Sequence, residues 1–163
     1  MSILRREIEL TVQLGEEPTE MRTMGIVSWL PDIEVLAMRS YCGPSGLVLL
    51  LITTDPCKAS DVLQAAGFRC KSNPVILVGP LCRSGLAASV GTELANLGID
   101  VLYSYVSRAK AGYQYLVLRT TEDDRAVQAL EASAGIRDAA QWKSRQDRNV
   151  VSESESSLQE TAA

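Results

Sequence analysis

The sequence predicts an α+β protein built from two βαββαβ units in tandem, each an antiparallel sheet with both helices on one face. One observation is an internal repeat of roughly 66 residues, in which Ile33-Glu-Val-Leu corresponds to Ile99-Asp-Val-Leu. The other is that strand-like and helix-like patterns follow the same order in both copies. We therefore divide the chain into a first unit at residues 1–72 and a second at 73–143. Residues 144–163 have almost nothing to bury, and we expect a disordered tail there.

The first unit opens with a strand at residues 8–14, where apolar and polar side chains alternate. A helix follows at 19–30, with Thr19 as its N-cap and Pro31 ending it. The remaining elements are two strands, a helix that ends at a glycine, and a brief fourth strand, at residues 33–39, 47–52, 55–67 and 69–72.

The second unit opens with a buried strand at residues 75–78 and a loop at 79–85, after which Ser84 caps a helix that Gly98 ends. Apolar residues of that helix fall on one stripe. The pattern then predicts a hairpin of two strands and a final helix with acidic residues in its first turn, at residues 99–107, 113–119 and 122–134.

Composition excludes several functional classes. The net charge of −4 argues against general nucleic-acid binding, which requires a basic face. The chain has no histidine, so the commonest general base and metal ligand is missing, and we expect no metal site and no cofactor. Its four cysteines form no CxxC pair, and we expect buried free thiols at Cys42, Cys57, Cys70 and Cys82.

The chain shows no sign of membrane insertion or secretion. No apolar run approaches the ~20 residues of a membrane span. The first residues, Met1-Ser-Ile-Leu-Arg-Arg, are not followed by a signal-peptide core. We therefore expect a cytoplasmic protein without a membrane partner.

Three segments of the second unit resemble the ACT domain, a small regulatory module that senses amino acids. They are Val75-Ile-Leu-Val-Gly-Pro-Leu-Cys-Arg-Ser-Gly-Leu-Ala, Leu94-Ala-Asn-Leu-Gly-Ile-Asp-Val-Leu-Tyr-Ser-Tyr and Tyr115-Leu-Val-Leu-Arg-Thr-Thr-Glu-Asp-Asp-Arg-Ala. The tandem arrangement resembles stand-alone paired ACT proteins and covers about 130 of the 163 residues. The resemblance implies ferredoxin-like units, a regulatory role and a ligand held between units.

The loop before the first helix of the second unit is the predicted ligand site. A loop that leads into a helix N-terminus presents unpaired backbone N–H groups and a positive dipole end, which suit a carboxylate. The family's loop ends in Pro-Gly, whereas here Gly85 stands five residues after Pro80, so the register is shifted. The candidate contacts are Leu81, Cys82, Arg83, Ser84, Gly85 and Leu86. Arg83 and Ser84 are equally compatible with an exposed charge and a simple helix cap.

An amino-acid ligand also needs a partner for its ammonium group. In the family, the second strand of a neighbouring unit lies across the site, and Asp100 and Glu34 are the acidic residues at the start of those strands. The alternative is that both are ordinary charges at a strand edge, where they hinder aggregation.

Four tyrosines alternate on the predicted hairpin, at positions 103, 105, 113 and 115, and should share one face of the sheet. A nucleotide-stacking surface would need a basic surround and its own aromatic consensus, so we expect a packed interface instead.

We expect a non-catalytic regulatory or sensor protein that binds an amino acid or a similar small carboxylate between its units. The alternatives are an interaction adaptor without a ligand and an acylphosphatase-like hydrolase, although no nucleophile and base pair supports catalysis. The strands at residues 47–52 and 75–78 are apolar on both faces while helices cover one. We therefore expect a second chain to cover the other face, which gives a homodimer, and the two units to meet edge to edge through their second strands.

Overall fold

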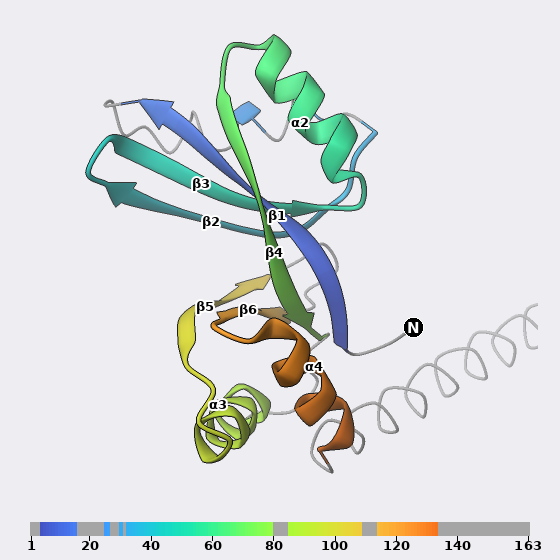
Figure 1. The fold of residues 1–163 in the computed structure, drawn as a ribbon. Coiled ribbons are helices and arrows are strands. Elements are labelled where there is room, and N and C mark those ends of the chain that lie inside the picture. The colour runs from blue at the N-terminus through green and yellow to red at the C-terminus, as the bar shows by residue number, and fades with distance from the viewer. Residues whose placement is uncertain are drawn as a thin grey trace, which may run out of the picture.

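The structure is a computed structural model, which describes residues 4–15, 25–26, 30, 32–79, 85–108 and 114–133. Its elements follow one another in an α+β order (Figure 1). They are β1 (Leu4–Gly15), β2 (Val35–Gly43), β3 (Gly46–Thr53), α2 (Pro56–Ala65), β4 (Arg69–Val78), α3 (Leu86–Asn96), β5 (Val101–Arg108), β6 (Gln114–Thr120) and α4 (Asp123–Ala132). Gly25 and Ile26 are helical as well, within the range predicted for the first helix.

The strands form one antiparallel six-stranded sheet in the order β2-β3-β1-β4-β6-β5. β1 and β4 pair along their whole shared length, from Leu4 opposite Val78 to Gln13 opposite Arg69. One half of the sheet is therefore β2-β3-β1-β4 and the other is β5-β6-β4-β1, and each half has the strand order of a βαββαβ unit. The two predicted ferredoxin-like units are confirmed, and they share their two central strands.

β4 differs from the two short strands predicted at residues 69–72 and 75–78. It runs unbroken because β1 lies beside it throughout, so the expected boundary between residues 72 and 73 falls inside one strand. The N-terminal part of β1, at residues 4–7, occupies the place of a fourth strand in the second unit. The two units are thus interlocked through the sheet.

Local signals explain where the helices begin and end. Asp55 caps α2 by accepting the backbone N–H of Lys58 at 2.9 Å, and the chain leaves the helix through Gly67 at a φ of 90°. α3 has Gly85 as its N-cap, at a φ of 88°, rather than the predicted Ser84, which lies outside the described residues. A left-handed φ suits glycine, which has no Cβ.

The described helices α2, α3 and α4 cover the outer face of the sheet. α2 packs on β1 and β3 of the first half, whereas α3 and α4 pack on the second half, so the helices lie at opposite ends of the molecule (Figure 1). The inner faces of the two halves pack on each other. That third core joins side chains from both halves, namely Leu36, Ala37, Val48, Leu50, Ile52, Val75, Leu77, Tyr105, Tyr115 and Val117.

This inner core removes the reason given above for a homodimer. The second apolar face of β3 and β4 is covered by the hairpin of the same chain rather than by another copy. The second strands of the two units are β2 and β5, the outer strands of the sheet, and they contact each other as expected, although they are not neighbours in the sheet's hydrogen-bonded strand order. They meet through Ser107, whose Oγ accepts the backbone N–H of Met38 at 2.9 Å and donates to its carbonyl oxygen at 3.1 Å.

The cysteines depart in part from expectation. Cys42, Cys57 and Cys70 are free thiols, as predicted, but Cys42 and Cys57 are exposed. Cys42 lies near the β2–β3 turn and Cys57 in the first turn of α2, where neither packs into a core. Cys82 lies outside the described residues.

Candidate binding site between the two halves of the sheet

Glu9 is a carboxylate that the fold has placed entirely out of contact with water, at 0% exposure. It lies on the inner side of β1, while its neighbour Leu10 on the other side packs beneath α2. Successive side chains of a strand point to opposite faces, so Glu9 is buried once the inner face is covered. A buried carboxylate is costly unless hydrogen bonds compensate for the lost water.

Two tyrosines of β5 supply that compensation. The hydroxyl of Tyr103 donates to Glu9 Oε1 at 2.6 Å, and the hydroxyl of Tyr105 donates to Glu9 Oε2 at 2.7 Å. These lengths are typical of hydroxyl bonds to a charged oxygen. The two bonds connect β1 to the edge strand of the second half.

The same environment keeps both tyrosines protonated. Burial raises the pKa of Tyr105, and the charge of Glu9 and the hydrogen bond to it raise that pKa further. Burial and Glu9 also raise the pKa of Tyr103, although Arg119 acts in the opposite direction. Ionised tyrosine would face a negative charge at close range, so at neutral pH both side chains act as donors and not as bases.

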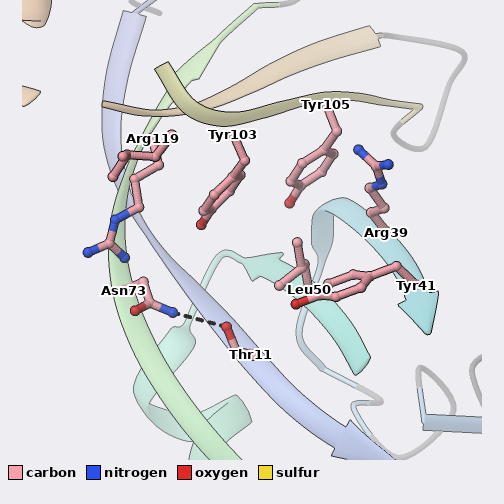
Figure 2. Close-up of a pocket in the computed structure, with 9 residues that line it drawn as sticks. Thr11, Arg39, Tyr41, Leu50, Asn73, Tyr103, Tyr105 and Arg119 are labelled. Atoms are coloured by element: carbon pink, nitrogen blue, oxygen red, sulfur yellow. Dashed lines mark hydrogen bonds between the residues drawn. The ribbon is translucent and has the colours of Figure 1, made fainter. Parts of the chain in front are cut away.

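A pocket of about 450 Å³ opens beside these tyrosines. Figure 2 shows Tyr103 and Tyr105 descending into it from β5, opposite Thr11, Leu50 and Asn73. Each half of the sheet contributes part of the wall, and the volume is in the range of small-molecule sites. The lining residues are Thr11, Arg39, Tyr41, Leu50, Asn73, Leu102, Tyr103, Tyr105 and Arg119.

The polar groups of the pocket include two guanidinium groups. Arg39 comes from β2 and Arg119 from β6, and they lie on opposite sides of the pocket with the tyrosine rings between them (Figure 2). Arg39 lies over the ring of Tyr105, 5.7 Å from its centroid, and Nη1 donates to the carbonyl of Ser104 at 3.4 Å. Within the described part of the chain neither guanidinium forms an ion pair with a carboxylate.

The amide of Asn73 is held in place at the base of the pocket. Its Nδ2 donates to the hydroxyl oxygen of Thr11 at 2.9 Å, across the β1–β4 ladder. Together with the two arginines, this arrangement can bind an anionic molecule with an apolar body, which would contact Leu50 and Leu102. Among the described residues, no three acidic or cysteine side chains gather in a way that could hold a metal ion.

The predicted site residues lie elsewhere in the fold. Gly85 is the N-cap of α3, and Leu86, the first residue of that helix, is buried in the outer core of the second half. Glu34 and Asp100 are exposed and stand before β2 and β5, where their carbonyls accept the N–H groups of Thr54 and Thr121, both at 3.0 Å. Glu34 and Asp100, which correspond in the sequence repeat, therefore form the same backbone hydrogen bond in both units.

None of those four residues lines the pocket. Leu81, Cys82, Arg83 and Ser84 fall outside the described residues, so the predicted loop site stays a prediction. The tyrosines, by contrast, behave as expected: Tyr103, Tyr105 and Tyr115 share the inner face and form part of a packed interface. Tyr113 is outside the described residues.

None of the residues that line the pocket was predicted as a site residue from the sequence. Arg119 falls in the strand expected at residues 113–119, and Glu9 is one of the polar residues that alternate with apolar ones at residues 8–14. One available signal was the combination of alternating tyrosines with arginines on neighbouring strands, because those side chains are suited to both packing and anion binding.

Comparison with known proteins supports the fold. No protein-family model matches the chain, and neither does any curated protein sequence. Among solved structures, protein BT0572 from Bacteroides thetaiotaomicron superposes with a TM-score of 0.65 at 20% identity, over 80% of this chain and 90% of that one. The aspartokinase alpha and beta subunits give a TM-score of 0.50 at 16% identity, over 78% of this chain and 93% of that one.

The ligand-free regulatory subunit of aspartate kinase from Thermus thermophilus also matches, with a TM-score of 0.50 at 11% identity, over 83% of this chain and 95% of that one. At sequence identities this low, the matches are evidence for a shared fold and not for a shared function. Of the helices in the described part of the chain, none has the length and apolar character to cross a membrane. The likeness to paired ACT domains, first noticed in three sequence segments, is confirmed as an ACT-like fold.

Proposed function

We propose that this protein is a non-catalytic regulatory sensor that binds an amino acid or a similar small carboxylate between its two ACT-like units. The observation that supports it most is the inter-unit pocket of about 450 Å³, with Arg39 and Arg119 in its wall. Guanidinium groups bind carboxylates through paired, charge-assisted hydrogen bonds. The regulatory role rests on the likeness to the aspartate kinase regulatory subunit.

A ligand in this pocket would touch both halves of the sheet. Arg39 and Tyr41 belong to the first half, and Tyr103 and Arg119 to the second. Binding energy gained across such a boundary favours one relative placement of the two halves over others. This is the physical basis on which a non-catalytic protein can pass a signal to a partner.

The loop at residues 81–86, with Asp100 and Glu34, is the other location for the same function. Variants distinguish the two locations: Arg119→Gln should weaken binding at the pocket by about tenfold or more, and Arg83→Ala should weaken binding at the loop. Arg69→Gln is the control, because Arg69 is exposed on β4 and does not line the pocket.

The experiment is a thermal-shift screen of the purified chain against the twenty amino acids and a panel of small carboxylic acids at millimolar concentration. A ligand at 100 times its Kd should stabilise the folded state by about 2.7 kcal/mol, which is easily detected as a rise in Tm. We expect at least one carboxylate to raise Tm, and the rise to be clearly smaller in Arg119→Gln but unchanged in Arg69→Gln. A null result across the whole panel would refute the sensor proposal.

A specific observation favours an interaction adaptor as the second candidate. Leu102 and Val106 of the edge strand β5 are 57% and 50% exposed. Exposed apolar side chains on an edge strand are suited to contact with another protein, including a second copy of this chain. Light scattering at tens of micromolar tests the second copy, since a dimeric mass that Val106→Asp converts to a monomeric one would place the contact there.

A further inference from the structure

We infer that the inter-unit pocket selects a dianionic small molecule, one with acidic groups at both ends and no ammonium group, over a zwitterionic α-amino acid. The inference rests on the proposed function, since it names the ligand class of the same pocket. It follows from the charges in the wall, from their separation and from the state of Glu9.

The charges of the wall are all positive. Arg39 and Arg119 are the two charged side chains among the nine described lining residues, and no carboxylate is among them. An α-amino acid brings an ammonium group, which binds well only where an acidic or carbonyl oxygen receives it. Two guanidinium groups beside an ammonium group would oppose its binding.

Glu9 is the nearest acidic candidate, and its oxygens are already occupied. Oε1 accepts the hydroxyl of Tyr103 and Oε2 accepts that of Tyr105, and the side chain has no exposed surface. Glu9 is not among the lining residues, whereas the two tyrosines that bind it are. An ammonium group that approached Glu9 would have to compete with these two short, charge-assisted bonds and with the burial of the carboxylate.

The two arginines lie on opposite sides of the pocket, with Tyr103 and Tyr105 between them (Figure 2). One compact carboxylate placed against Arg39 leaves Arg119 without a partner, and the reverse is equally true. A molecule with an acidic group at each end satisfies both guanidinium groups at once. Its middle would lie against Leu50 and the tyrosine rings.

Asn73 and Thr11 add donors and acceptors near the floor, as expected for a ligand with a hydroxyl or keto group along its length. The recognised class is thus a short-chain dicarboxylate or an equivalent dianion. Side chains of the pocket alone are enough to recognise such a molecule.

The test is isothermal titration calorimetry of the full-length chain with three probes of matched length at constant ionic strength. Glutarate carries two carboxylates, L-glutamate adds an α-ammonium group, and pentanoate keeps one carboxylate; succinate and adipate vary the length. We expect at least one dicarboxylate to bind about tenfold or more tightly than pentanoate, and glutarate to bind more tightly than L-glutamate.

Each arginine variant should affect the dicarboxylate in its own right. Arg39→Gln and Arg119→Gln are each expected to weaken its binding by about tenfold or more, towards the affinity of the monocarboxylate. Arg69→Gln removes the same charge from an exposed position of β4 outside the pocket, and should change the affinity less than threefold. Circular dichroism of all three variants confirms that they are folded.

The outcomes separate the inference from the proposed function. If L-glutamate or another amino acid binds as tightly as every dicarboxylate and the arginine variants weaken it, the dianion inference fails while the sensor function stands. If a dicarboxylate binds but Arg39→Gln and Arg119→Gln behave like Arg69→Gln, the ligand occupies another site and the inference fails. If no carboxylate and no amino acid binds, both fail.

Discussion

The hydroxyl of Tyr105 provides a direct test of the contact that joins β5 to the centre of the sheet. Tyr105→Phe removes one oxygen atom and leaves the ring, which is only 5% exposed, in place. The lost bond is 2.7 Å long and ends on a carboxylate with no access to water. A hydrogen bond to a charged group contributes about 1.5–3 kcal/mol, so we expect the free energy of unfolding to fall by that amount.

Tyr103→Phe should cost less, near 1.5 kcal/mol, because Tyr103 is only partly buried and water can take the place of its hydroxyl. The double variant should lose at least the sum of the two single losses. With one tyrosine left, Glu9 keeps a donor, whereas with none it becomes an uncompensated buried charge, at a cost of about 3–5 kcal/mol.

The assay is urea denaturation of each variant, followed by far-UV circular dichroism at pH 7. Tyr41→Phe is the matched control: it removes a hydroxyl from the same pocket, but Tyr41 is 44% exposed, so its variant should stay within about 0.5 kcal/mol of the parent. The reasoning would be refuted if Tyr105→Phe also stayed within that range, or if Tyr41→Phe lost as much.

Three further predictions concern pH, the contact between edge strands and the loop. Folding raises the pKa of Tyr103 and Tyr105, so their contribution to the free energy of unfolding is complete below the unfolded pKa of 10.0 and is lost as pH rises above it. Above pH 10 the free energy of unfolding of the parent should fall by up to about 2.7 kcal/mol per pH unit, and that of the double Phe variant should fall less. Urea titrations at pH 9 to 11.5 measure both. Ser107→Ala deletes both bonds to Met38 and should lower the free energy of unfolding by about 1–2 kcal/mol, whereas Ser104→Ala, at an exposed position three residues earlier, should leave it unchanged. If the loop holds the ligand, Arg83→Ala should weaken binding by about 1–3 kcal/mol and Asp100→Asn should weaken an amino acid but spare a ligand without an ammonium group; calorimetry showing both variants equal to the parent would exclude the loop.

Local chemistry was enough to predict α2 and β3. Asp55 and Gly67 mark the ends of α2 because a capping carboxylate and a left-handed glycine act over three or four residues of chain. β3 was expected at residues 47–52 and runs from Gly46 to Thr53, since its unbroken apolar run suits a strand covered on both faces. Signals of this kind do not depend on what the strand pairs with.

The join between the units could not be predicted in the same way. Two short strands were expected, at residues 69–72 and 75–78, and Pro74, which gives no N–H to a ladder, lies between them. In the fold, β6 pairs with β4 only from Ile76 to Val78, so at Pro74 the strand has β1 on one side and no described strand on the other. A proline is tolerated there, as on any edge, and β4 continues through it.

Glu9 shows why the site itself was missed. Alternation along β1 states which residues share a face, but the face is covered by Tyr103 and Tyr105, which follow 94 and 96 residues later. Only the sharing of β1 and β4 brings these strands together, and no local motif encodes it. The same sharing puts Arg39 on one half and Arg119 on the other, so a molecule that binds both also fixes how the halves meet. Affinity for such a ligand and the geometry between the units are therefore linked, and a substitution in the inner core that shifts one must shift the other.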